Sequence, residues 1–170
     1  VKIPASLKKG VLFHQGSMHL TYNFRGLHLA LEDDRLQLLM AHTAPYNAII
    51  QYTKEDIPRD KWLQVTVTYD GSSRAQGYQL YLDGQRAALD VDQDLLYKDI
   101  VFENSAGQPA LQFGAWERGK GLEGGKIRDI YVYNRELTPL EINGLVQVKT
   151  LDALRKADPQ NIPPDLSTQL

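Results

Sequence analysis

The sequence predicts an all-β domain, an antiparallel jelly-roll sandwich of two sheets with one short helix near its carboxyl end. Three observations point to this class. Apolar side chains recur at every second residue through much of the chain, the alternating segments are short and evenly spaced, and turn residues separate them. No helix-length segment lies between them, which excludes a parallel sheet built from strand–helix–strand units. We expect about nine strands.

The first half of the chain supplies four of the predicted strands. Residues 18–24 (MHLTYNF), 26–32 (GLHLALE) and 35–41 (RLQLLMA) repeat the alternating pattern, with the acidic stretch 32–35 (EDDR) as the turn between the second and the third. Residues 47–53 (NAIIQYT) form the fourth, which ends before a proline-containing turn.

The next two strands form a hairpin pattern. In residues 62–70 (WLQVTVTYD), the apolar side chains occupy the odd-numbered positions 63 to 69, as a half-buried strand requires. A second strand begins at Tyr78 and ends at the dipeptide Asp83-Gly84, which suits the positive φ angles of a tight turn into a further strand. The late strands are 100–104 (IVFEN), 110–115 (ALQFGA) and 126–134 (KIRDIYVYN).

A helix signal follows the last strand. Thr138 offers a hydroxyl cap, Pro139 suits the first helical position, and Glu141 can reach back to the cap. We therefore divide the chain into a sandwich over residues 1–137, a helix over 138–149, and a proline-containing linker or tail over 150–170.

Composition excludes several function classes. The 170 residues suit one domain with a sizeable core, and a net charge of −2 argues against a nucleic-acid or membrane-surface partner. Without cysteine there is no disulfide, thiolate metal site or cysteine nucleophile. No apolar run approaches the length of a membrane span. Because the first residue is Val1 rather than methionine, we expect it to follow a cleavage site or to lie inside a longer protein.

Catalytic motifs are missing from the sequence. The glycine run at 119–125 has no serine or threonine after its lysine and leads into a predicted strand, so we interpret its glycines as shaping a loop. No Glu-x-Glu pair suggests a glycosidase, and no GxSxG elbow suggests a serine hydrolase. The four histidines, of which His19 and His28 could face each other across a hairpin, lack the spacing of a zinc site.

Aromatic residues in the predicted loops remain as candidates for recognition. Trp116 and Arg118 lie in the glycine-rich loop, and Tyr46 and Asn47 lie in the loop APYN. Aromatic rings stack on the apolar faces of sugars, while amides and guanidinium groups hydrogen-bond their hydroxyls. We predict that these four residues bind a ligand, with Trp116 stacking and Tyr46 forming a second wall. We interpret Trp62, Tyr69, Tyr78 and Tyr133 as core or corner residues.

Several separated motifs resemble one family. W-x-x-V-x-V-T-Y-D-G-S at 62–72, L-Y-L-D-G at 80–84, L-Q-F-G-A at 111–115 and G-G-K-I-R-D-I-Y-V-Y-N-R-E-L-T at 124–138 resemble the laminin-G-like modules of the concanavalin A-like lectin/glucanase superfamily. The likeness covers roughly residues 1–146 and looks closest to modules in large exported proteins of planctomycete-type bacteria, some of which carry a cytochrome-c-like domain.

The resemblance implies a non-catalytic module that recognises a glycan or a partner protein, in an exported, periplasmic or extracellular setting. It also implies a possible calcium ion, with Asp129 as a ligand, although Arg128 stands where an acidic residue is frequent. An alternative is a structural or docking module in a multi-subunit assembly. An enzyme of the same superfamily is a third reading, which the missing carboxylate pair disfavours.

The same resemblance implies that the first strands of such a module are missing before Val1. We therefore expect an open sheet edge, where the rest of a larger polypeptide or another chain pairs with the domain.

Overall fold

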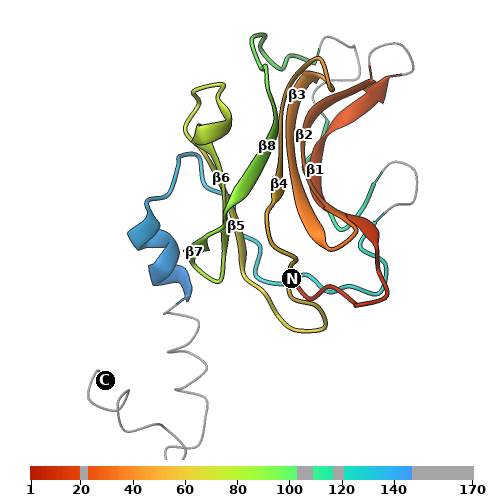
Figure 1. Ribbon diagram of the computed structural model, residues 1–170, viewed down its shortest axis with the longest axis vertical. Coiled ribbons are helices and arrows are strands. Elements are labelled where there is room, and N and C mark those ends of the chain that lie inside the picture. The colour runs from red at the N-terminus through yellow and green to blue at the C-terminus, as the bar shows by residue number, and fades with distance from the viewer. Residues whose placement is uncertain (20–22, 103–108, 117–120, 147–170) are drawn as a thin grey trace, which may run out of the picture.

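The computed structural model describes residues 1–19, 23–102, 109–116 and 121–146. Within them, two antiparallel sheets face each other, which confirms the predicted two-sheet β-sandwich (Figure 1). The larger sheet has the strand order β8-β4-β3-β2-β1-β9, and the smaller has the order β5-β6-β7. All of these strands pair antiparallel.

The larger sheet is built mainly from consecutive hairpins. Its strands are β1 (Lys9–His19), β2 (Asn23–Glu32), β3 (Arg35–Thr43), β4 (Asn47–Thr53), β8 (Leu89–Asp94) and β9 (Gln112–Phe113). The smaller sheet contains β5 (Val65–Tyr69), β6 (Tyr78–Leu82) and β7 (Gln85–Arg86), and the 3-10 turn η1 (Ala75–Gly77) leads into β6.

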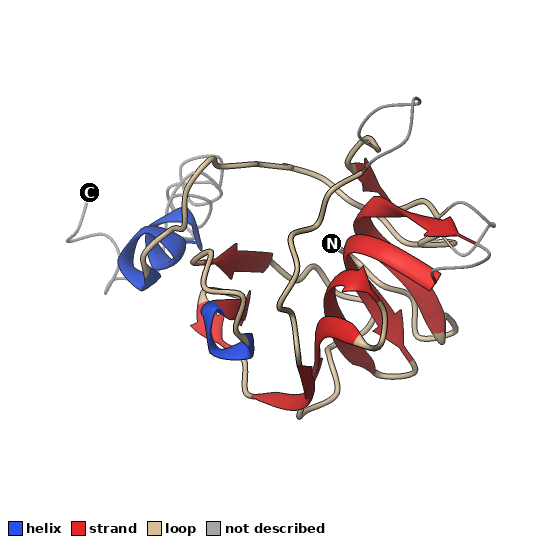
Figure 2. Cartoon of the chain, turned by 90° about the horizontal axis from the view of Figure 1, so that it is seen from above, coloured by secondary structure: helices blue, strands red, loops and turns tan. Residues whose placement is uncertain are grey.

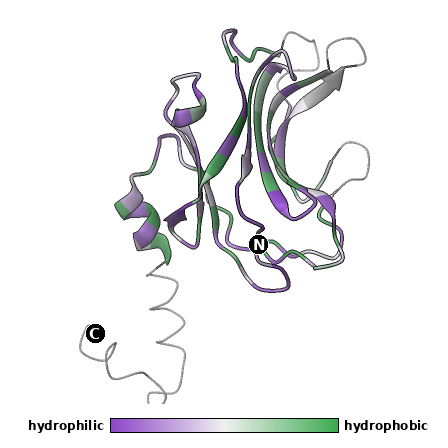
Figure 3. Cartoon of the chain, viewed as in Figure 1, coloured by the Kyte–Doolittle hydropathy of each residue, from purple (hydrophilic) through white to green (hydrophobic). Residues whose placement is uncertain are grey.

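The core lies between the two sheets. Alternate residues of β2, β3 and β4 point inward, so that the hydrophobic alternation read from the sequence becomes one buried face. Along the strands in Figure 3, hydrophobic and hydrophilic residues are interspersed accordingly. The seven residues of this cluster that are at most 1% exposed are Ile3, Leu29, Leu31, Leu36, Leu38, Ile49 and Leu80.

One buried amide links the sheets across this core. Gln51 of β4 is 2% exposed, and its Nε2 donates hydrogen bonds to the backbone oxygens of Ala75 (3.1 Å) and Tyr78 (2.7 Å). These two acceptors belong to η1 and β6, on the opposite layer. The hydrogen bonds of Gln51 therefore fix the relative position of the two sheets.

Most of the predicted strands are confirmed. Residues 47–53 form β4, the 35–41 pattern lies in β3, and the pattern at 62–70 contains β5. The hairpin turn after β6 has Asp83 at φ 47° and Gly84 at φ 80°, as the dipeptide predicted. The segment 110–115 forms a strand only at its centre, as β9.

Near the start of the larger sheet, one strand prediction was wrong and one strand was missed. Residues 18–24 are not one strand, because they span the end of β1 and the start of β2, and residues 20–22 lie outside the described chain. The strand β1 itself, which begins at Lys9, was not predicted. His28 consequently pairs with His14 rather than with His19.

Two predicted late strands are not strands in the structure. Residues 100–102 have no strand conformation, and the remaining part of that segment lies outside the described chain. Residues 126–134 pair only through a single bridge between Lys126 and Lys2. A strand needs a neighbour on at least one edge, and between this segment and β5 there is instead a cavity of about 860 Å³.

The predicted helix begins at residue 139 and is described to residue 146, with the remainder of the predicted segment outside the described chain. It lies beside the small sheet rather than between the sheets (Figure 2). Ile142 is fully buried against Tyr81 and Leu137. The part of the chain that the structure describes contains no helix with the length and apolar character of a membrane span.

The capping residues of this helix bond as predicted. The Glu141 carboxylate accepts hydrogen bonds from the Thr138 backbone N–H (2.9 Å) and hydroxyl, and the Thr138 Oγ1 accepts one from the Glu141 N–H (3.3 Å). Arg135 adds a bidentate ion pair to the same carboxylate. The bonds from Arg135, followed by those from Thr138, lower the pKa of Glu141 to about 2.

We expect the helix cap to weaken in acid. The folded-state pKa of Glu141 is below its ordinary value of 4.5, so its stabilisation is complete above about pH 4.5 and is lost as the pH falls toward 2. The variant Glu141→Gln should lose helical circular dichroism less steeply over this pH range than the wild type. The control is Glu136→Gln, which should keep the wild-type profile; a wild-type profile in Glu141→Gln would contradict the role of the carboxylate.

Candidate functional site

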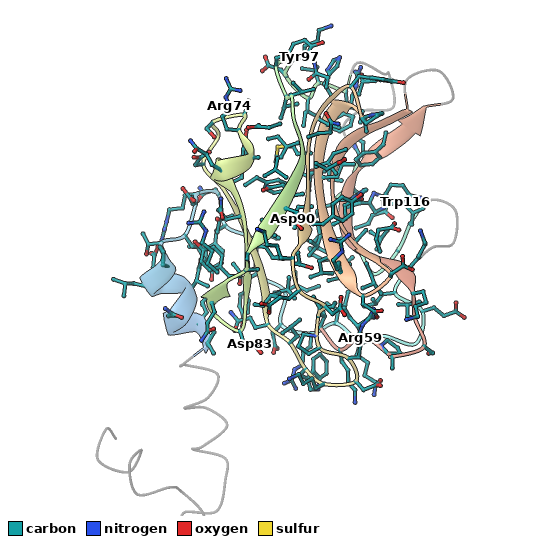
Figure 4. All side chains as sticks on the ribbon, viewed as in Figure 1. Arg59, Arg74, Asp83, Asp90, Tyr97 and Trp116 are labelled. Carbon is teal, nitrogen blue, oxygen red and sulfur yellow. The ribbon has the colours of Figure 1, made fainter. Side chains whose placement is uncertain are left out.

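Two loops meet at one end of the larger sheet and present exposed tyrosines. Tyr46 lies between β3 and β4 and is 74% exposed, and Tyr97 follows β8 and is 72% exposed. Figure 4 shows Tyr97 at the upper tip of the molecule. Lys98 Nζ lies 6.0 Å from the centroid of the Tyr97 ring, which adds a cation to the same loop. We call residues 44–47 and 95–98 the tip loops.

Asn47 joins the tip loops from inside. It is 3% exposed, and its Oδ1 accepts hydrogen bonds from the backbone N–H groups of Tyr97 (3.2 Å) and Lys98 (3.3 Å). The backbone adds a bond from Leu95 N–H to Ala48 O at 2.8 Å. The buried amide oxygen of Asn47 holds the second loop in place, and the predicted contact of Asn47 with a ligand stays a prediction. These hydrogen bonds therefore hold the two loops that carry Tyr46 and Tyr97 in fixed relative positions.

Arg25 of β2 fixes the chain that follows the tip loops. Its Nη1 donates to Val101 O at 2.8 Å, and its Nε donates to His42 O at 2.9 Å. The His42 Nδ1 lies 2.9 Å from Asp99 O. The segment after β8 is thus anchored to the sheet by side chains from two other strands.

Trp116 occupies a different place, on the outer face of the larger sheet. Its ring packs against His14 (4.6 Å between centroids), Phe24 (5.5 Å) and His28 (5.9 Å), and it is half-buried. Figure 4 shows it on the side of the sheet that faces away from β5 and β6. Trp116 thus covers the sheet, whereas Tyr46 projects from a loop. Arg118 lies outside the described residues.

A polar row crosses the same outer face. The Gln37 Nε2 donates to the Tyr52 hydroxyl, which leaves the Gln37 Oε1 to accept from His28 Nε2 at 2.7 Å. The proton of His28 is therefore on Nε2, and burial lowers the pKa of this histidine, so the ring is neutral near pH 7. The Arg35 guanidinium lies 5.3 Å from the Tyr52 ring centroid. Sequence reasoning missed this row, because its members share no motif.

Three carboxyl groups of the described chain take part in structural hydrogen bonds. Bonds from Lys8, Ser72 and Arg135 lower the pKa of Asp34, Asp70 and Glu141 respectively. A general acid needs a raised pKa. These carboxyl groups suit structural bonds rather than proton transfer.

Asp129 lies on the segment after the glycine-rich loop. Its Oδ2 is 3.6 Å from Arg128 Nε, and the Arg128 guanidinium also lies 4.2 Å from the centroid of the Trp62 ring. Among residues 1–19, 23–102, 109–116 and 121–146, no group of three or more acidic, histidine or cysteine side chains could hold a metal ion. Calcium at Asp129 stays a prediction.

The glycine-rich loop is shaped by close backbone contacts. A Cβ on Gly121 would lie 2.4 Å from Gly114 O, and a Cβ on Gly10 would lie 2.7 Å from Gly121 O. The described part of this loop thus passes against the start of β1 where no side chain fits. This arrangement supports the structural interpretation of these glycines.

Comparison with known proteins agrees with this architecture. The family model described as the concanavalin A-like lectin/glucanases superfamily, Laminin_G_3, matches residues 1–143. No curated protein matches the chain. A crystal structure of an S-layer domain-containing protein from Clostridium thermocellum is 20% identical, with a TM-score of 0.33, over 83% of this chain and 64% of that one. The chain thus spans less than two thirds of that structure. On the family match, the chain belongs to the laminin-G-like family of the concanavalin A-like lectin/glucanase superfamily.

Proposed function

We propose that this domain is a non-catalytic recognition module of an exported protein, and that it binds carbohydrate through the tip loops. One observation carries the proposal. Tyr46 and Tyr97 are both more than 70% exposed, yet the loops that bear them are locked together by the buried amide of Asn47. The family often serves as a binding module, which agrees with this role.

The geometry of the tip suits the chemistry of sugars. Tyrosine offers an apolar ring for stacking and a hydroxyl for hydrogen bonding, and a sugar presents both kinds of surface. Because the loops are held in place before binding, less conformational entropy is lost when the ligand docks. Lys98 supplies a hydrogen-bond donor beside Tyr97, and it favours hydroxyl-rich or acidic sugars over cationic ones.

We expect Tyr46→Ala and Tyr97→Ala each to weaken glycan binding at least about tenfold, because each removes one stacking surface. The measurement is a glycan array on the wild type, followed by calorimetry with the best glycan from that array. The matched control is Tyr131→Ala, which removes another exposed tyrosine from a different segment. Wild-type affinity in both tip variants, or equal loss in the control, would contradict the proposed site.

The second candidate function is a structural or protein-docking module in an assembly. The observation that favours it is the edge of β5 beside the large cavity, which has no neighbouring strand within the part of the chain that the structure describes. Native mass spectrometry of the full-length protein distinguishes the two. A stable monomer with sugar affinity supports the recognition module, whereas constant co-purification of one partner without sugar affinity supports the docking module.

A further inference from the structure

The first two residues already form a short piece of a central strand. Val1 exchanges two backbone hydrogen bonds with Leu63, at 2.7 and 2.8 Å, and Lys2 exchanges two with Lys126, at 2.8 and 2.9 Å. Both neighbours run antiparallel to this piece. Consecutive residues that bond to opposite sides are the pattern of a strand flanked on both edges.

The chain that follows Leu63 forms β5, and one edge of β5 has no hydrogen-bonded neighbour among the described residues. The bonds from Asp83 N–H to Gln64 O and from Asp70 N–H to Gly77 O show that the even-numbered residues around β5 bond toward β6. The N–H and C=O groups of the odd-numbered residues therefore point to the opposite edge, in line with the Leu63 bonds to Val1. Within the described chain, β5 pairs only with β6. These odd-numbered residues are Val65, Val67 and Tyr69.

The space beside this edge is large and mainly apolar. A cavity of about 860 Å³ is bordered by β5, by the inner faces of β1, β2 and β3, and by residues 127–137. Val65 and Val67 pack toward the core but remain half-buried, whereas Leu80 on the adjacent strand is fully buried. Val132 on the far border is 70% exposed. The hydrophobic core is therefore incompletely packed between β5 and residues 127–137.

The far border is able to pair with the same additional strand. Ile127 follows Lys126 and lies against the core, opposite Val1 in register. Asp129 has φ 53°, the left-handed conformation found at some β-bulges. A bulge adds one residue to a strand, so that the alternation of side chains shifts by one residue after it. With a bulge at Asp129, Ile130 and Val132 lie on the same face as Ile127. The alternation read at 126–134 then describes a strand whose neighbour, beyond Lys2, is not among the described residues.

We propose that this space, the β5 slot, accepts one further polypeptide strand that runs antiparallel to β5 and continues the Val1 backbone in the amino-terminal direction. The pairing of Val1 and Lys2 defines both the direction and the register of this strand. It would join β5 to the 127–134 segment and close the sandwich along this side.

The register specifies the side chains of the added strand. Counting back from Val1, the second, fourth and sixth residues lie opposite Val65, Val67 and Tyr69, so they face the core and should be apolar. The first, third and fifth residues point away from the core and should be polar. A shift by one residue would reverse the two sets.

A pair of extended chains tests this inference. The first carries Val-Thr-Val-Thr-Val-Thr before Val1, which places valine at every core-facing position. The matched control carries Thr-Val-Thr-Val-Thr-Val, with the same composition in the opposite register. Thermal unfolding, amide hydrogen exchange of β5 and sedimentation velocity are measured on both chains and on the 170-residue chain.

We expect the first extension to raise the unfolding midpoint by about 5 °C or more over the 170-residue chain, and the control to raise it by less than half as much. The amides of Val65, Val67 and Tyr69 should exchange at least about tenfold more slowly only in the first extension. Equal midpoints for the two extensions, or unchanged exchange at these amides, would overturn the inference. A concentration-dependent dimer of the 170-residue chain with these amides protected would also overturn it, since a second copy would then fill the slot.

Discussion

Replacing Gly26 by alanine is expected to lower the free energy of unfolding by about 3 kcal/mol or more. Gly26 has φ 129°, a conformation that side chains other than glycine rarely adopt. A Cβ at this position would lie 2.1 Å from Gln15 O and 2.5 Å from the Cα of Gly16. Both contacts are with backbone, so only a separation of β1 from β2 relieves them.

The location of Gly26 makes the effect large. It pairs with Gly16 on one side and with Ala41 on the other, inside the larger sheet. Equilibrium denaturation in urea measures the change. The control is Gly71→Ala, at φ 83° with no atom within 4 Å of the added carbon, which should cost only about 1–2 kcal/mol. Equal losses in the two variants would show that backbone strain, rather than the clash, sets the cost.

The second large effect is expected for Gln51→Leu, which should lower the free energy of unfolding by about 2–4 kcal/mol. Leucine nearly matches the size of glutamine, so the packing changes little. The backbone oxygen of Tyr78, however, loses the donor that Gln51 now provides in the core, whereas the Ala75 oxygen keeps its bond from the Tyr78 N–H. A buried carbonyl oxygen without a donor destabilises the folded state, because it has lost its hydrogen bonds to water and gains none in the core.

The matched control for this change is Gln76→Leu, on the exposed side of η1. It should alter the unfolding free energy by less than about 0.5 kcal/mol. A wild-type stability for Gln51→Leu would mean that the two sheets do not depend on this amide for their relative placement.

The parts of the fold that could be predicted are those with a clear local signal. β5 alternates valine and threonine, β4 is an apolar run that ends before a proline-containing turn, and local rules also indicated the turn at Asp83 and the cap at Thr138. β1 escaped prediction because both of its faces are covered. Leu12 packs into the core, and His14 lies beneath Trp116, so the alternation disappears.

The strand prediction at 126–134 was wrong although this segment does show the alternating pattern that β1 lacks. Its alternation predicts a strand, but pairing is a property of two segments, and the described chain supplies a neighbour only at Lys126. A sequence pattern reports which face a strand buries and says nothing of whether the neighbouring strand is in place.

The candidate site could be predicted only in part. Tyr46 was indicated by its loop and projects as expected, but Asn47 turned out to be buried, because sequence alone does not reveal which loop polar groups meet a second loop. Tyr97 was missed because it lies between predicted strands, fifty residues after Asn47 in the sequence. Its partnership with Tyr46 arises from the pairing of β4 with β8, which is a tertiary contact.

The bonds of Val1 have a practical consequence for anyone who produces this protein. Because its nitrogen is 2.7 Å from Leu63 O and its neighbour Lys2 is paired on the other side, an affinity tag fused to this end begins at a half-buried, hydrogen-bonded residue rather than at a free end. Its first residues would extend from Val1 toward the β5 slot, so we expect the tag sequence itself to change the melting and crystallisation behaviour of the domain.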